Sequence, residues 1–165
     1  MTSLTETLSE MVGVAERYCK LIDEPVRNSD AWLESLYNLM PQLHSAVTLL
    51  NAYDTGDMQV SAVDLDERFE LYSRLRQQLG EQDSYWLEFD ALPEEMHMSG
   101  SLADDLTDIY FDLRHGLALM DEAWPQRAAQ AWQSSYRLHW GQHLVDAERH
   151  LYALRVRNQL PMSGA

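Results

Sequence analysis

Apolar residues recur every three to four positions along most of the chain, which is the period of an amphipathic helix. The first such stretch opens at Ser3, with Glu6 at capping-box spacing, and Pro25 ends it. A second stretch begins near Ser29. It contains Pro41, where we expect a kink instead of a break, because the apolar phase continues past the proline. The N-terminal part of the chain is therefore predicted to form two helices.

Three further helices are predicted. The third ends at Gly80, a usual residue after a helix C-terminus, and the fourth, capped by Ser101, extends to about Met120. The last opens at Pro125 and meets no strong breaker for about thirty residues, or about 50 Å. The third helix is marked by apolar residues at helical spacing, Leu65, Phe69, Tyr72, Leu75 and Leu79. The predicted fold class is all-α: one domain over residues 1–165, a bundle of about five helices with a long C-terminal helix.

Residues 81–100 lack the helical period and mix aromatic residues with acids and Pro93. We interpret them as an irregular, extended segment that holds two aromatic side chains on the surface of the bundle. Aromatic residues at a surface are typical of protein interfaces. The residues of this candidate partner-binding site are Tyr85, Trp86 and Phe89.

The composition combines an ordinary apolar content with a strong acidic excess. Apolar residues make up 45 %, enough for a hydrophobic core, and the formal net charge is −15 at pH 7. A charge of this sign disfavours binding to nucleic acids and to anionic membrane surfaces. The acids are concentrated in residues 81–124, which hold twelve of them against one base, Arg114, whereas the last helix is mildly basic. We therefore expect a protein partner, with the acidic region receiving a basic one.

The single cysteine, Cys19, excludes an internal disulfide framework, and its helical surroundings predict a small buried hydrophobe. The first ten residues lack the pattern of a signal peptide, and no apolar run is long enough for a transmembrane helix. We therefore expect a cytoplasmic protein.

Two long strings in the C-terminal half are similar to those of a known family. They are GSLADDLTDIYFDLRHGL at residues 100–117 and SYRLHWGQHLVDA at residues 135–147, with YWLEFD at residues 85–90 upstream. These strings resemble the bacterial domain of unknown function 5063 family. The resemblance implies a small helical bacterial protein, and it brings no assigned reaction, cofactor or catalytic residue. The chemistry must therefore be inferred from the residues of this chain.

Polar residues follow the border of the apolar stripe on each of the last two helices. On the last helix they are His139, His143, Asp146 and His150, and on the fourth they are Asp105, Asp108, Asp112 and His115. Antiparallel packing of the two helices would bring these borders together along a seam.

One interpretation of the seam is a site for a divalent transition metal. The candidate ligands are His139, His143, Asp146, Asp108 and Asp112. Three protein ligands would leave a position for water and hydrolytic chemistry. The other interpretation, which such borders favour, is a hydrogen-bonded row that holds two helices in register. The sequence has no HExxH motif, phosphate-binding loop or Gly-x-Ser-x-Gly elbow.

A second apolar row on the last helix consists of Leu138, Val145 and Tyr152, which recur every seven residues. Burial within the monomer is the simpler interpretation, and a homodimer through this face is the alternative.

The absence of a nucleophile motif or a phosphate motif favours a non-enzymatic, cytoplasmic helical adaptor or accessory protein that acts through protein–protein contacts. The alternative function is a metal-binding, hydrolytic helical-bundle enzyme that uses the His/Asp row. Mimicry of nucleic acid by the acidic surface is a further hypothesis.

Overall fold

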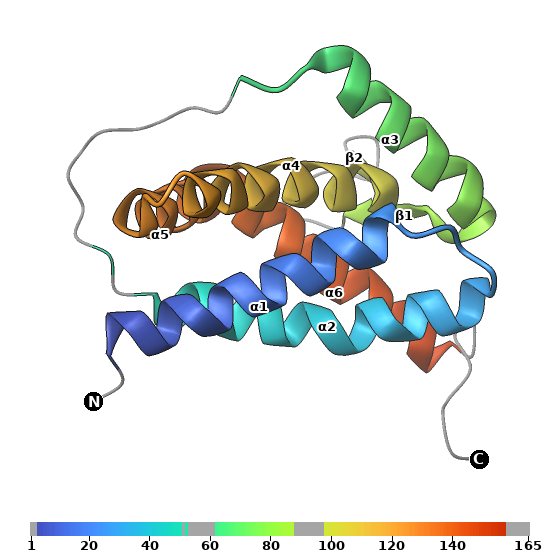
Figure 1. Ribbon diagram of the computed structural model, residues 1–165. Coiled ribbons are helices and arrows are strands. Elements are labelled where there is room, and N and C mark those ends of the chain that lie inside the picture. Colours follow the sequence, from blue (N-terminus) through green and yellow to red (C-terminus); the bar gives the residue numbers. More distant parts are fainter. Residues whose placement is uncertain (1–2, 51, 53–61, 88–97, 158–165) are drawn as a thin grey trace.

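The computed structural model describes residues 3–50, 52, 62–87 and 98–157, and it confirms the all-α class. Figure 1 shows α1 (Leu4–Asp23) and α2 (Ser29–Leu49) side by side. Both α1 and α3 (Leu65–Leu79) pack on α4 (Leu102–Asp121). Among the described residues, no helix is long and apolar enough to cross a membrane. The remaining elements are η1 (Gly80–Gln82), β1 (Ser84–Leu87), β2 (Met98–Ser101), α5 (Pro125–Ser135), η3 (Tyr136–Trp140) and α6 (Gly141–Val156).

The helix boundaries follow from capping residues that the sequence predicts. Ser3 and Glu6 form both hydrogen bonds of the capping box at the start of α1. Ser101 caps α4, and Gly80 follows α3 with a φ of 55°, a conformation that glycine adopts easily. The second helix continues through Pro41, in agreement with its unbroken apolar phase.

A cluster of buried apolar side chains joins the helices. Trp132 of α5 is fully buried, and its Nε1 donates a 3.1 Å hydrogen bond to the carbonyl oxygen of Leu113 in α4. The indole lies against Gly116, where a larger side chain would overlap it. Cys19 is buried as predicted, and burial raises the pKa of its thiol to about 12. The thiol is therefore un-ionised at neutral pH and serves as part of the core.

The third helix is present, but the apolar residues that mark its first two turns are not buried. Leu65 and Phe69 are 77 % and 67 % exposed. The buried apolar residues of α3 are Leu71, Leu75 and Leu79. This helix packs on α4 and turns Arg68 toward it, where the guanidinium pairs with two aspartates. That rotation leaves Leu65 and Phe69 facing solvent.

The long C-terminal helix is confirmed, since α5, η3 and α6 follow one another without a break from Pro125 to Val156. Residues Tyr136–Trp140 form a π turn within it. The expected burial of the second apolar row within the monomer is wrong, because α6 covers the core with other residues. Leu138, Val145 and Tyr152 are 65 %, 46 % and 60 % exposed.

The strands β1 and β2 form an antiparallel pair in which Tyr85 lies opposite Gly100. The extended conformation predicted here is confirmed for the described residues of the segment. Tyr85, however, does not lie on the surface: its ring is half-buried against Gly100 and stacks on His150. Trp86 is 68 % exposed, as expected, and Phe89 lies outside the described residues.

Candidate metal centre

The seam expected between the fourth and the last helix is present, because α4 packs against both η3 and α6. The spacing of three and four residues places the aspartates of α4 on one side of that helix. The residues that meet in the seam are Asp105, Asp108 and Asp112 of α4, His139 of η3 and His143 of α6.

His143 bridges two of these aspartates. Its Nδ1 lies 2.7 Å from Oδ1 of Asp105, and its Nε2 lies 3.1 Å from Oδ2 of Asp108. An ionised carboxylate only accepts hydrogen bonds, so Nδ1 carries the proton that Asp105 accepts. In a neutral imidazole, Nε2 then directs its lone pair toward Asp108.

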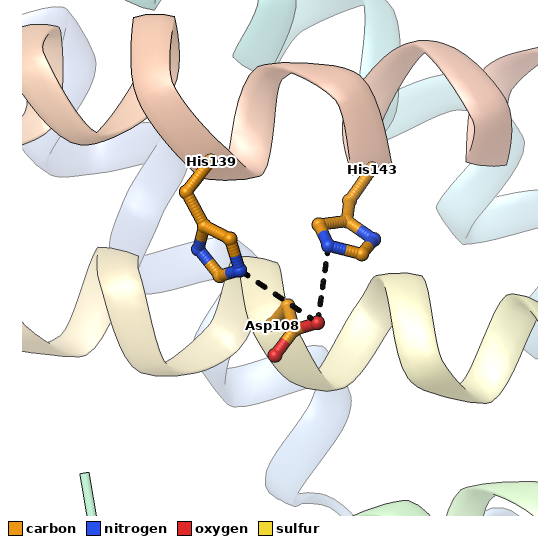
Figure 2. Close-up of side chains that lie close together, drawn as sticks. All are labelled: Asp108, His139 and His143. Atoms are coloured by element: carbon orange, nitrogen blue, oxygen red, sulfur yellow. Dashed lines mark ion pairs between the residues drawn. The ribbon is translucent and has the colours of Figure 1, made fainter.

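His139 repeats this arrangement one helical turn earlier. Its Nδ1 lies 2.7 Å from Oδ2 of Asp112, and its Nε2 lies 3.9 Å from the same Asp108 oxygen that faces His143. Figure 2 shows both imidazoles directed toward Asp108. The His139 side chain is 50 % exposed, so this side of the cluster is accessible to solvent.

Asp108 is held by Arg68 of α3. Nε and Nη2 of the guanidinium lie 3.0 and 2.7 Å from Oδ1 of Asp108, and Nη2 also lies 3.0 Å from Oδ1 of Asp104. Both contacts to Asp108 use Oδ1, which leaves Oδ2 directed at the two histidines.

The three converging atoms have the spacing of ligands around one metal ion. One ligand atom from each of Asp108, His139 and His143 lies within 4.8 Å of the other two. Bonds of about 2.1 Å in a tetrahedral site place neighbouring ligand atoms about 3.4 Å apart. The observed separations of 3.1 and 3.9 Å from the Asp108 oxygen lie on either side of that distance.

The centre carries more negative than positive charge. Four aspartates of α4 lie around it, and Arg68 is the one Lys or Arg that pairs with them among the described residues. Burial raises the pKa of Asp105 to about 6, against the hydrogen bonds from His143 and Tyr85 that lower it. Burial lowers the pKa of His143, but Asp105 and Asp108 outweigh it and the net shift is upward. The raised pKa of His143 shows that the surrounding aspartates favour a positive charge at this position.

Tyr85 of β1 positions Asp105. Its hydroxyl donates a hydrogen bond to Oδ2 of Asp105, and its ring stacks on His150 with 4.8 Å between the centroids. His150 in turn donates from Nε2 to the carbonyl oxygen of Gln82, at 2.6 Å. A Cβ atom at Gly100 would overlap the Tyr85 ring, so glycine is required at this position. Tyr85 is thus a positioning residue and not the surface anchor that the sequence suggested.

Three members of the predicted rows do not join the cluster: Asp146, His115 and His150, the last of which bonds to Gln82. Asp146 accepts a 3.1 Å hydrogen bond from Gln142, and His115 has a buried Nε2 with no hydrogen-bond partner among the described residues. Conversely, sequence reasoning missed Arg68 and Tyr85. Neither has a local signal, because each acts on a residue at least twenty positions away.

Comparisons with known proteins agree with this fold. The crystal structure of protein BF1032 from Bacteroides fragilis matches with a TM-score of 0.73 over 91 % of this chain and 95 % of that chain, at 22 % sequence identity. At this identity the likeness shows a shared fold. Among curated proteins no match is found.

The family resemblance of the two C-terminal strings extends to nearly the whole chain. Residues 2–157 match the family described as "Domain of unknown function (DUF5063)". The protein therefore belongs to the DUF5063 family.

Proposed function

We propose that this protein binds one divalent transition-metal ion through Asp108, His139 and His143. The observation that carries the proposal is that each ligand has its other polar atom held by a separate residue. The three pairs are Asp108 with Arg68, His139 with Asp112, and His143 with Asp105. Histidines that bind metals usually donate their second nitrogen to such a partner, which fixes the tautomer and aims the lone pair at the ion.

The ligand set indicates the class of metal and of reaction. Two imidazoles and one carboxylate suit zinc, iron(II) or manganese(II). Three protein ligands leave a coordination position for water, whose pKa falls to about 7 on zinc. The half-exposed side at His139 supplies access for a substrate. Hydrolysis by a metal-bound water is therefore the activity that we propose for the centre.

The competing explanation is a hydrogen-bonded seam without metal. A second proton on His143 would let Nε2 donate to Asp108 at 3.1 Å, which accounts for half of the arrangement. The hydrogen-bonded seam also accounts for Nδ1 of His139, which bonds to Asp112, but it gives no partner at Asp108 to Nε2 of His139, which lies 3.9 Å from the same oxygen, beyond hydrogen-bond distance. A cation between the three atoms would account for the direction of both Nε2 atoms toward Asp108.

The test uses protein purified without an affinity tag. After treatment with a chelator, zinc, manganese or iron(II) is titrated by calorimetry, and the melting temperature is measured with and without each ion. We expect one ion per chain and a higher melting temperature. His143→Gln and Asp108→Asn should abolish both effects.

The matched control is His44→Gln. His44 also pairs with a carboxylate, Glu148, at 2.9 Å, but it lies outside the cluster, so this variant should bind metal normally. If none of the three ions binds or raises the melting temperature, the metal centre is excluded and the hydrogen-bonded seam remains.

A protein-binding role in the cytoplasm is a second proposal, supported by Trp86, which is 68 % exposed on β1. Tryptophan is enriched at the energetic centres of interfaces. Trp86→Ala should reduce the amount of a specific partner recovered from lysate. Equal recovery by both proteins would count against this role for Trp86.

A further inference from the structure

The exposed face of the C-terminal helical segment is apolar and cationic. Its apolar residues are Leu138, Val145, Tyr152 and Val156, which are 46–65 % exposed. Arg137 and Arg149 are exposed on the same segment and form no ion pair with any described residue. We call these six residues the α6 stripe.

The stripe differs in charge from the rest of the chain. No Asp or Glu is classed as exposed between residues 137 and 157, although the chain has a net charge of −15. The acids of this region are half-buried and bonded: Asp146 accepts from Gln142, and Glu148 pairs with His44. The α6 stripe therefore combines unpaired positive charge with exposed apolar surface.

The shape of the surface suits a helix. Leu138, Val145 and Tyr152 repeat every seven residues, the spacing at which one helix contacts another along a seam. A groove of about 270 Å³ adjoins the stripe between α2 and α6; its lining includes Tyr37, Pro41, Leu151 and Tyr152, together with Glu148, which is paired with His44. Such a groove accommodates an apolar anchor side chain of a bound helix.

We propose that the α6 stripe binds an acidic amphipathic helix of another protein. Carboxylates flanking the apolar face of that helix would meet Arg137 and Arg149. The acidic surface of the rest of the chain would repel the bound helix and so direct it to the stripe. A second copy of the chain is a less suitable partner for the stripe. Its own stripe would place two further arginines against Arg137 and Arg149 and would bring no exposed acid to pair with them. The proposal is independent of the metal centre.

The experiment measures binding of a fluorescent synthetic helix of three heptads, with Leu at the apolar positions and Glu elsewhere. A matched peptide carries Lys in place of Glu. We expect the acidic peptide to bind the full chain and the basic peptide not to bind at this stripe. The double variant Arg137→Glu/Arg149→Glu should weaken acidic-peptide binding by about tenfold or more.

Two further variants make the result specific. Val145→Asp should also weaken binding, whereas Arg76→Glu, at an exposed arginine of α3 that bonds to Tyr72, should not. Circular dichroism of each variant checks that the helices are retained. The proposal is overturned if the acidic peptide does not bind, or binds the double variant equally well.

Other occupants give distinct results that also overturn it. Sedimentation would show a dimer that Val145→Asp dissociates if a second copy covers the stripe. Binding to phosphatidylglycerol vesicles that the double variant loses, without binding of the acidic peptide, would assign the stripe to a membrane surface instead.

Discussion

The guanidinium of Arg68 contacts one oxygen of Asp108 and leaves the other free. Nε and Nη2 lie 3.0 and 2.7 Å from Oδ1, whereas Oδ2 faces His139 and His143. A residue of α3 thus fixes which atom of α4 meets the histidines of the C-terminal segment. The candidate centre therefore depends on how α3, α4 and the C-terminal segment pack together.

Arg68→Ala should destabilise the metal-free protein. It leaves Asp104 and Asp108 without their cation, and hydrogen bonds to charged groups are each worth about 1.5–3 kcal/mol. We expect the free energy of unfolding in urea to fall by about 1–3 kcal/mol. Arg76→Ala, at an exposed arginine, should change it by less than about 0.5 kcal/mol. Equal losses in the two variants would show that Arg68 does not stabilise the cluster.

Asp105→Asn should weaken metal binding although Asp105 is not one of the proposed ligands. Asparagine can present its amide N–H to Nδ1 of His143 and so favour the wrong tautomer. We expect the dissociation constant for zinc, measured by calorimetry, to rise by about 10–100-fold. Asp146→Asn is the matched control. Among the described residues the Asp146 carboxylate has one hydrogen bond, from Gln142, and none to a histidine, so the zinc affinity of this variant should fall much less than that of Asp105→Asn.

Gly100→Ala and Gly13→Ala should have opposite effects on stability. A Cβ at Gly100 overlaps the Tyr85 ring. The ring cannot move away without breaking its hydrogen bond to Asp105 and its stacking on His150, so the free energy of unfolding should fall by about 1–3 kcal/mol. A Cβ at Gly13 meets nothing within 4 Å, and alanine in α1 should stabilise by about 0.5–1 kcal/mol. Thermal unfolding measures both changes. No loss in Gly100→Ala would show that Tyr85 is not tightly held.

His150 should make the metal-free protein less stable in acid. Burial lowers its pKa, against the bond to Gln82 that raises it, so the folded state keeps a neutral imidazole while the unfolded chain takes up a proton. The stability that it contributes is complete above about pH 6.5 and is lost as pH falls through that value. Asp105 has the opposite effect. Its pKa is raised to about 6 in the folded protein, so its contribution to stability increases as the pH falls below about 6.

The comparison of wild type with His150→Gln isolates this effect. Urea unfolding at about pH 7.5 and about pH 5.5 gives the loss on acidification for each protein, and the variant should lose less. An identical loss in both proteins would mean that His150 does not contribute to the pH dependence.

The sequence by itself determined the helices and the two polar rows. Ser3, Gly80, Ser101 and Pro125 mark boundaries that the structure confirms, because capping depends on residues within one turn. The rows on the fourth and last helices followed from the 100° turn per residue, which fixes the face of a helix that each residue occupies.

Tertiary structure alone decided which atoms meet. Arg68 reaches Asp108 from 40 positions away, Tyr85 turns inward to Asp105, and Leu138, Val145 and Tyr152 remain exposed. Local periodicity sets the rotation of a residue about its own helix axis, but it contains no information about which neighbouring helix covers that face. Contacts between helices depend on how all of them pack together, and it was this packing that selected Asp108, His139 and His143 from eight polar candidates and excluded Asp146.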